Sequence, residues 1–357
     1  MMLNVSVDKL KPGMKVAKSI YNNDGNILIS AGAKLKSSYI SRLKELGFES
    51  IYIAPKELPN IEQPETLSER TKVETVQAVS SVMEDIKEDN QLNTQLIKEQ
   101  VNSIIKEILA SEEQIIHLND IRNYDNYIFY HSVNVAVLSL LIALEMGYNE
   151  MELKKIATGA LLHDIGVTLV ADKLVKNRDD LSESEHQEYK KHTEHGYRIL
   201  TENDEVNIKA RHIAYQHHEK LDGTGYPRQL KGDEILDYAQ LVSVANIYDT
   251  LTNKVDSSKK LLPNQALNVL ESLADSKLNR DYITALKKYV ALYPIGTLVL
   301  LNNGQTALVI EVKQDNLREP IVKIIKDKAG NRVKEDKIIN LAENKELEIK
   351  EVKTLFE

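Results

Sequence analysis

Six side chains that commonly bind metal ions lie in the middle of the 357-residue sequence. They are His131, His163, Asp164, His192, His217 and His218. Imidazole and carboxylate groups are donors that Mn, Fe, Co, Ni and Zn accept. Five histidines and one aspartate exceed what one tetrahedral zinc ion needs. The set therefore predicts two metal ions that share a bridging carboxylate, with Asp164 as the bridge and several separate helices supplying the donors.

The remaining histidines carry less weight in this prediction. All nine fall between His117 and His218, but an isolated histidine on a helix is usually a satisfied core or surface residue. That interpretation is favoured for three of them: His117, His186 and His212. His195 follows His192 by three residues and is interpreted as a neighbour on the same helix face. The dipeptide His163-Asp164 is weak evidence alone, and it gains weight from the acidic and glycine-rich segment that follows His217-His218.

That segment begins at Glu219, a further candidate donor, and continues into Asp222-Gly223-Thr224-Gly225-Tyr226-Pro227. Glycine permits positive φ and close approach of the backbone to a ligand, while proline fixes the exit of the loop. A loop directly after a metal-binding helix is well placed to face substrate. The sequence predicts that Tyr226 is presented at the tip of this loop, and an ordinary glycine-rich turn is the alternative.

The motifs ALLHDIG and HHEKLDGTGYP, together with the residues above, resemble those of HD-GYP domains, a branch of the HD phosphohydrolase superfamily. The resemblance covers about residues 119–260. It implies an all-helical domain that binds two or three metal ions, often iron or manganese. It also implies hydrolysis of the bacterial messenger cyclic di-GMP to pGpG or GMP.

The resemblance assigns roles to individual residues. It implies that His131, His163 and Asp164 hold the first metal, and that Asp164, His192, His217 and His218 hold the second. Asp164 and His163 are then the catalytic pair, since they centre the metals that activate a hydroxide for in-line attack on phosphorus. The predicted substrate contacts come from the loop: Asp222, Gly223, Gly225, Tyr226 and Pro227.

Departures from the family pattern affect the first metal. Its last ligand is expected from the segment VSVANIYDTL, where Asn246 replaces the usual aspartate and offers only a neutral oxygen. Asp249, three residues later, is a candidate to compensate, although the family pattern gives it another place. Trinuclear members carry a glutamate where this chain has Tyr127, so the sequence predicts two metal ions, with Fe or Mn favoured.

Other departures from the family pattern replace positively charged side chains with neutral ones. The lysine that follows HDIG in the family contacts a substrate phosphate, and here it is Val167. The arginine expected nine residues after Asn246 is Val255, and the basic residue expected twelve after it is Ser258. Lys259 and Lys260 follow at once, and Lys259 is the predicted replacement that contacts substrate.

These substitutions leave more than one function open. The first is a metal-dependent cyclic di-GMP phosphodiesterase. The second is a catalytically weak or inactive signalling or scaffold protein that binds partners or nucleotide, because each lost charged hydrogen bond costs ~1.5–3 kcal/mol. A third, hydrolysis of a different phosphoester, ranks below both. The predicted partners are cyclic di-GMP and other signalling proteins, such as diguanylate cyclases.

The elements that must position these residues give a mainly α fold. Residues 1–58 are predicted as a small N-terminal α+β module, with a hairpin through Asp24-Gly25 and a helix ending at Gly47. Residues 66–118 are predicted as a helical stalk or linker. Four of its apolar residues have heptad spacing: Ile97, Val101, Ile104 and Ile108. A helix packed on its own chain and a stalk that forms a homodimer carry equal weight.

The chemistry is predicted to lie in a helical HD-type metal-binding domain over residues 119–290. Its longest helical runs are 131–147, 150–166, 183–200, 205–219 and 238–253. Residues 293–357 are predicted as a C-terminal β-rich domain, a small antiparallel sheet or barrel, because β-branched runs alternate with Asn-Gly turns.

Composition restricts the classes of protein. Lys plus Arg is 46 and Asp plus Glu is 54, and the net charge of −8 argues against direct DNA binding. The absence of cysteine excludes disulfides, thiolate zinc sites and cysteine nucleophiles. The N-terminus shows no signal peptide, and the most apolar stretch, 133–144, is shorter than the ~20 residues that span a bilayer. The expectation is a soluble, cytoplasmic protein without membrane contact.

Overall fold

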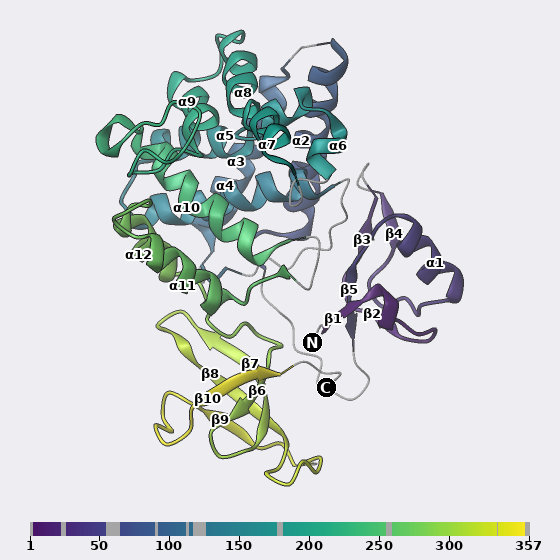
Figure 1. The fold of residues 1–357 in the computed structure, drawn as a ribbon. Coiled ribbons are helices and arrows are strands. Elements are labelled where there is room, and N and C mark those ends of the chain that lie inside the picture. The colour runs from purple at the N-terminus through teal and green to yellow at the C-terminus, as the bar shows by residue number, and fades with distance from the viewer. Residues whose placement is uncertain are drawn as a thin grey trace.

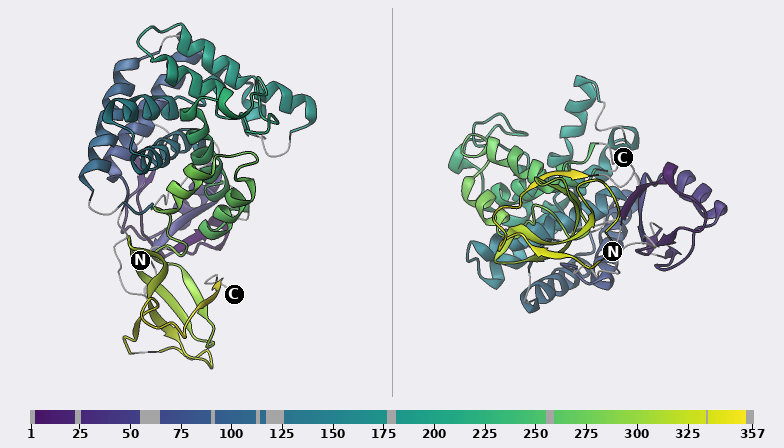
Figure 2. Two further views of the ribbon diagram at one scale, coloured as in Figure 1. Left: turned by 90° about the vertical axis from the view of Figure 1, so that its left-hand side faces the viewer. Right: turned by 90° about the horizontal axis from the view of Figure 1, so that it is seen from below.

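The computed structural model describes residues 3–22, 26–54, 65–89, 92–111, 114–116, 126–176, 181–254, 259–333 and 335–353. Three bodies are visible in Figure 1: a small N-terminal module, a large helical body and a C-terminal sheet. Two further views show the same division, with the N-terminal module beside the helical body and the C-terminal sheet at one end of it (Figure 2). The predicted order of a small α+β module, a helical body and a β-rich end is confirmed.

The N-terminal module combines short strands with one helix. Its strands are β1 (Leu3–Ser6), β2 (Lys15–Val16), β3 (Ile20–Tyr21), β4 (Ile27–Ile29) and β5 (Ser50–Ala54), and its helices are the 3-10 helix η1 (Val7–Lys9) and α1 (Ser37–Glu45). Strands β1, β5 and β2 form an antiparallel sheet in that order, and β3 pairs with β4. The hairpin is therefore confirmed, although its Asp24-Gly25 turn lies outside the described residues. Gly47, with φ of +72°, follows α1 as predicted.

Two helices follow the N-terminal module, α2 (Glu69–Asp89) and α3 (Thr94–Ala110). The four heptad-spaced residues of α3 are all buried, together with Ile105. They belong to the same hydrophobic core as the apolar residues of α4 (Tyr127–Glu145) and α5 (Glu150–Leu161). The face that suggested a dimerising stalk is thus covered by the chain itself, which supports the first of the two interpretations.

The remaining helices surround α4 and α5 in the helical body. They are α6 (Asp172–Lys176), α7 (Glu183–Lys190), α8 (His192–Thr201), α9 (Ile208–Gln216), α10 (Asp237–Thr252), α11 (Pro263–Leu273) and α12 (Arg280–Lys287), with the 3-10 helices η2 (Ile165–Leu169) and η4 (Gly232–Glu234). The sequence suggested one helical run over residues 183–200. The structure divides it at Lys191 into α7 and α8, so that His192 begins a new helix.

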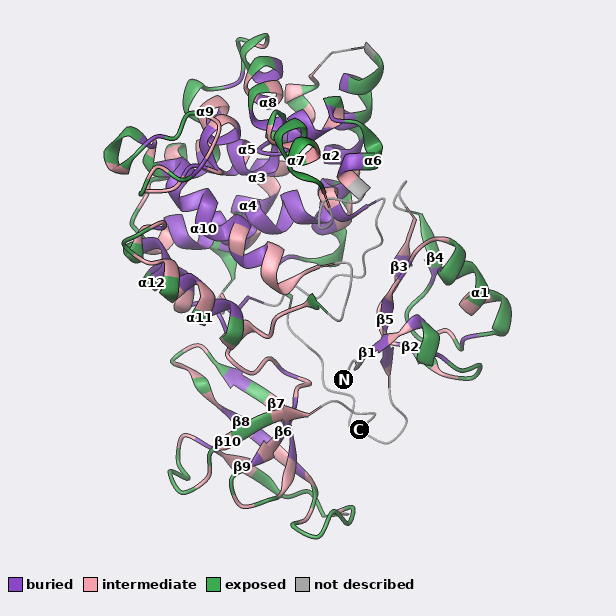
Figure 3. Cartoon of the chain, viewed as in Figure 1, coloured by how far each residue is buried: buried purple, intermediate pink, exposed green. Residues whose placement is uncertain are grey.

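Helix α4 lies at the centre of the helical body. It has 19 residues and begins at Tyr127, one turn before His131, so it is longer than the apolar stretch 133–144 suggested. Among the described residues it is the one helix long and apolar enough to cross a membrane. All of its residues from Tyr130 to Ala143 are buried, and Figure 3 shows its continuous buried surface among the other helices. Such extensive burial is typical of a helix in the core of a protein.

The C-terminal sheet has five antiparallel strands in the order β10-β6-β7-β8-β9. Their bounds are β6 (Leu298–Leu301), β7 (Thr306–Lys313), β8 (Asn316–Lys326), β9 (Ile338–Asn340) and β10 (Ile349–Lys353). One face of the sheet buries a separate hydrophobic cluster that also includes Ile115 and Ala291. Ile115 precedes α4 and Ala291 follows α12, so the sheet packs against the two segments that connect it to the helical body.

Candidate metal centre

The predicted ligands lie mostly at helix ends that converge inside the helical body. His131 lies in the second turn of α4. His163 and Asp164 follow the end of α5, His192 begins α8, and His217 and His218 follow the end of α9. Five of the six are buried and His218 is partly buried. Helix ends can bring side chains from distant segments to one point because the chain turns there.

Asp164 lies between two groups of imidazoles. Its Oδ2 atom is 3.4 Å from Nε2 of His163 and 3.9 Å from Nε2 of His131. Its Oδ1 atom is 3.4 Å from Nε2 of both His192 and His217. The ligand atoms of His218 and of this second group all lie within 4.8 Å of one another. Each carboxylate oxygen therefore faces its own set of donors, as a bridging ligand requires.

Three of the histidines are held by backbone carbonyls through their Nδ1 atoms. The contacts are His163 to Ala160 at 2.7 Å, His192 to Tyr189 at 2.8 Å and His217 to Ala214 at 3.0 Å. An imidazole that donates Nδ1–H to a carbonyl keeps its lone pair on Nε2. Such second contacts orient metal-binding histidines in proteins. The Nε2 atoms of all three histidines therefore face Asp164.

His131 is held by a carboxylate instead. Its Nδ1 atom lies 2.7 Å from Oδ2 of Asp249 on α10. The other oxygen of Asp249 accepts hydrogen bonds from Nδ2 of Asn134 and of Asn253, each at 2.8 Å. Asp249 is fully buried and its oxygens are engaged by these three contacts. It orients a predicted ligand and does not replace one, so the expectation that it compensates for Asn246 is wrong.

Asn246 lies one turn before Asp249 on α10 and is buried. Its Oδ1 atom accepts a hydrogen bond from Oγ1 of Thr250 at 3.4 Å. The structure thus places Asn246 on the helix that supports His131, but its ligation of a metal stays a prediction.

Several polar atoms of this cluster have no hydrogen-bond partner among the described residues. They are Nε2 of His163, His192 and His217, and Oδ1 of Asp164. Buried polar atoms without partners cost free energy, so native proteins nearly always satisfy them. A divalent cation bound between imidazole and carboxylate donors satisfies all four atoms together. The cluster fits a divalent metal-binding site.

The electrostatics of the cluster favour the same conclusion. Burial lowers the pKa of His217 to about 4, and it also lowers the pKa of His192 and of His131. Burial alone would raise the pKa of Asp164, but the surrounding imidazoles, His163 first among them, hold it well below its usual range. His163 is the exception, because the carboxylate of Asp164 outweighs burial and raises its pKa. Most of the donors are therefore in the protonation state that binds metal at neutral pH.

A close contact of main chains fixes the distance between the two groups of donors. Gly166 in η2 lies against Gly196 in α8. A Cβ atom on Gly166 would collide with the carbonyl oxygen of His192 and with the amide nitrogen of Gly196. Because Asp164 and His192 flank this contact, only glycine at position 166 lets their segments approach so closely.

The loop after α9 is folded back on the end of that helix. Gly223 has a φ of +78°, as predicted for a turn glycine. Gly225 touches the backbone of residues 218–220, and a Cβ atom there would collide with Glu219 and Lys220. The ring of Tyr226 stacks on His218 with a centroid distance of 4.6 Å and an interplanar angle of 19°. Tyr226 is therefore half-buried beside a predicted ligand and does not project from a loop tip, which corrects the expectation.

Glu219 holds this loop in place. Its side chain is buried, and its two oxygens accept hydrogen bonds from the backbone amides of Arg228 at 2.7 Å and Leu230 at 3.0 Å. Sequence reasoning counted Glu219 only as a further donor. Its structural role could have been predicted from its position, because a carboxylate directly before a glycine-rich loop can accept hydrogen bonds from the backbone amides of that loop.

The other predicted substrate contacts lie further from the cluster or outside the described residues. Asp222 is exposed, and its Oδ1 atom accepts hydrogen bonds from the amide and hydroxyl of Thr224. Lys259 is exposed after α10, while Val255 and Ser258 lie outside the described residues. Val167 is buried in η2.

The other histidines that the structure describes are not part of the cluster. His186 is exposed, and His195 and His212 are half-buried. His117 lies outside the described residues.

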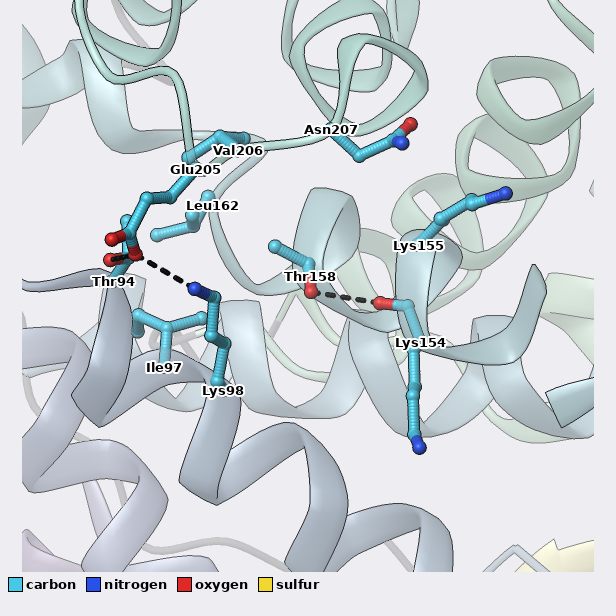
Figure 4. A pocket seen from close by; sticks show the side chains of 10 residues that line it. All are labelled: Thr94, Ile97, Lys98, Lys154, Lys155, Thr158, Leu162, Glu205, Val206 and Asn207. Atoms are coloured by element: carbon cyan, nitrogen blue, oxygen red, sulfur yellow. Dashed lines mark hydrogen bonds and ion pairs between the residues drawn. The ribbon is translucent and has the colours of Figure 1, made fainter. Parts of the chain in front are cut away.

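A separate pocket lies between α3, α5 and the segment before α9 (Figure 4). Its lining residues are Thr94, Ile97, Lys98, Lys154, Lys155, Thr158, Leu162, Glu205, Val206 and Asn207. Lys98 is paired with Glu205 at 2.7 Å, and Lys154 with Glu150 at 2.8 Å. None of the predicted site residues lines this pocket, so it is distinct from the metal centre.

Family models match both parts of the chain. A model described as "HD domain" matches residues 103–281, half of the chain, and includes every predicted metal ligand. A model described as "KOW domain associated with HD domain" matches residues 298–355, which contain the C-terminal sheet.

Several curated proteins are similar over part of their length. The cyclic di-GMP phosphodiesterase PA4108 of Pseudomonas aeruginosa is 27% identical, over 69% of this chain and 59% of that protein. A cyclic di-GMP phosphodiesterase of Thermotoga maritima is 33% identical, over 44% of this chain and 43% of that protein. The 3'3'-cGAMP-specific phosphodiesterase 3 of Vibrio cholerae is also 33% identical, over 46% of this chain and 35% of that protein. The chain thus matches between 35% and 59% of the length of these relatives.

Among solved structures, the chain is similar to Bd1817, an HDG"Y"P protein from Bdellovibrio bacteriovorus. The TM-score is 0.50 with 22% identity, and the match covers 80% of this chain and 98% of that chain. This likeness concerns the fold alone.

Proposed function

Since this chain belongs to the HD domain family, we propose that it is an HD-GYP-type, metal-dependent phosphodiesterase that hydrolyses cyclic di-GMP to pGpG or GMP. The observation that carries the proposal is the position of Asp164, whose two oxygens face two separate groups of imidazole Nε2 atoms. A carboxylate in this position is suited to bridge two cations. The similar cyclic di-GMP phosphodiesterases support the choice of substrate.

We assign the donors to two half-sites. The first half-site, with His131, His163 and Asp164, would hold one cation, and Asn246 would complete it. The second half-site, with Asp164, His192, His217 and His218, would hold the other. Fe or Mn is the metal that the resemblance to HD-GYP domains favours, and imidazole and carboxylate donors suit both. When bound, two such cations supply a water of lowered pKa and stabilise charge on phosphate oxygens.

The residues of the chain prepare the site for an anionic substrate. Asp164 lies between the two half-sites, the carbonyl and carboxylate partners of Nδ1 orient the imidazoles inward, and burial keeps most of them neutral. Glu219 and Gly225 hold the loop on the end of α9 so that Tyr226 lies beside His218. Tyr226 and its neighbours would then contact substrate next to the second half-site.

The experiment that tests the proposal is turnover of cyclic di-GMP by protein purified without oxygen and loaded with Fe(II) or Mn(II). We expect pGpG or GMP as product and loss of activity in Asp164→Ala. Asp172→Ala is the matched control, because Asp172 is an exposed aspartate paired with Lys87. Equal cleavage by wild type and Asp164→Ala would show that the activity comes from a contaminant.

A second candidate function is a catalytically weak or inactive signalling protein that keeps the fold and binds nucleotide or partner proteins. Two described positions favour it: Val167 contributes no charge, and Asn246 offers a neutral oxygen. The test restores both residues in Asn246→Asp with Val167→Lys. If the restored protein is no faster than wild type, these departures do not explain a low activity.

Because some relatives act on 3'3'-cGAMP, the substrate panel should include that dinucleotide. Partners such as diguanylate cyclases and a cytoplasmic location remain predictions.

A further inference from the structure

Lys190 lies beside the second half-site. It is the last residue of α7, two residues before His192 begins α8. Its Nζ atom lies 5.5 Å from the centroid of the Tyr226 ring. That ring in turn stacks on His218 and lies edge-on to His192 at 6.3 Å. The ammonium group of Lys190 therefore stands next to two predicted ligands of one cation.

No carboxylate of the described residues forms an ion pair with Lys190. The next residue, Lys191, differs in this respect, because it pairs with Glu188 at 2.6 Å and is exposed. A cation–π contact draws an ammonium toward a ring without neutralising its charge or using its N–H donors in ordinary hydrogen bonds. Lys190 thus keeps a positive charge available to an anion.

Two other positions near the cluster, Val167 and Lys220, do not provide such a cation. Val167, in the segment after Asp164, is apolar and buried. Lys220 is directed elsewhere, because its Nζ atom donates a hydrogen bond to Oγ of Ser243 on α10 at 3.0 Å. Lys190 is the described lysine whose ammonium contacts Tyr226.

We propose that the ammonium group of Lys190 binds a non-bridging phosphate oxygen of the ligand held at the second half-site. In this role Lys190 binds and orients the phosphate and transfers no proton. The identity of the natural ligand as a cyclic dinucleotide rests on the proposed function. The phosphate contact itself can be measured without turnover.

The test uses the full chain loaded with Mn(II) and inorganic phosphate as the probe, with affinity measured by calorimetry. The variants are Lys190→Ala and Lys190→Arg, and Lys191→Ala is the matched control because it removes the adjacent, carboxylate-paired lysine. We expect Lys190→Ala to bind phosphate roughly 10- to 100-fold more weakly, since it loses a charge-assisted hydrogen bond. Lys190→Arg should recover most of the affinity, and Lys191→Ala should match wild type.

Metal content and thermal unfolding of each variant show whether the centre and the fold are intact. The proposal is overturned if wild type binds no phosphate, if Lys190→Ala binds it as tightly as wild type, or if Lys191→Ala loses as much affinity. Turnover of cyclic di-GMP by the same proteins separates the two proposals. If phosphate binding depends on Lys190 while wild type cleaves no cyclic dinucleotide, the proposed function fails and the phosphate contact stands.

Discussion

Asp249 on α10 lies 2.7 Å, through Oδ2, from Nδ1 of His131 on α4. This contact fixes the face of His131 that is turned toward Asp164, and it ties α10 to the first half-site by way of a ligand. Asp249 thus supports the predicted ligand His131 and does not contact the predicted metal itself. A substitution at Asp249 can therefore change metal affinity while every predicted ligand residue is retained.

We expect Asp249→Asn to weaken the first half-site and spare the second. An amide cannot accept from His131, Asn134 and Asn253 together, so His131 loses its orientation. Loss of such a supporting partner costs roughly 10- to 100-fold in metal affinity. Elemental analysis should then find about half of the wild-type metal content, while Asp237→Asn, at the exposed start of the same helix, should change nothing. Equal loss from both half-sites would contradict the assignment.

Asn246→Asp should strengthen the first half-site. A carboxylate in place of an amide adds charge to a donor that is already buried on α10. We expect the affinity for Mn(II) to rise by about tenfold, equivalent to about 1.4 kcal/mol. Metal titration measures this, and Asn207→Asp, at the start of α9, adds the same charge away from the centre. An unchanged affinity would show that residue 246 does not reach the metal.

Metal affinity should rise with pH. His217, with its pKa lowered to about 4 by burial, is neutral over the working range. The pKa of His163 is raised above its ordinary value of 6.5, because Asp164 outweighs burial. Below that raised pKa, a metal must displace the His163 proton, so binding releases a proton and weakens as the pH falls.

Mn(II) titrations between about pH 6 and about pH 8, in buffers of different ionisation enthalpy, check this expectation. If Mn(II) binding released no proton at any pH in this range, the expectation would be contradicted. The variant Asp164→Asn removes the carboxylate that raises the pKa of His163, so any proton release at the first half-site should disappear with it.

Glu219→Gln should loosen the glycine-rich loop. The amide of glutamine presents a donor to one of the two backbone amides that the carboxylate now accepts from. Leaving a buried group unsatisfied costs ~1–3 kcal/mol of the free energy of unfolding. Urea unfolding measures the loss, and KM for cyclic di-GMP should rise because Tyr226 loses its support. Glu234→Gln is the control, since Glu234 also accepts from a backbone amide but is exposed.

The cluster of candidate donors could be predicted from the sequence because local motifs carry it, while metal binding by these residues stays a prediction. His163-Asp164 and His217-His218 are adjacent pairs, and each lies at the end of a helix whose apolar pattern is plain. Asp249 was harder to place, since nothing in its neighbours shows that His131, 118 residues earlier, lies against it. Lys190 was missed for the same reason, because its contact with Tyr226 depends on the folded loop.

The fold, too, could be predicted where neighbouring residues determine it and not where contacts between distant segments do. The break at Lys191 between α7 and α8 was missed because both sides have helical spacing and no glycine or proline intervenes. Strands β9 and β10 were missed because they are short and largely polar or exposed. The heptad face of α3 identified a buried surface, but only the structure shows that α4 and α5 cover it.

The contact of Gly166 with Gly196 has a consequence for how this centre can vary. Because main chain meets main chain there, the close approach of the segment after Asp164 to the start of α8 depends on glycine at position 166. The side chains at positions 246 and 167, on α10 and η2, take no part in this main-chain contact. A side chain at position 166 would therefore push the two donor segments apart, whichever residues carry the donors.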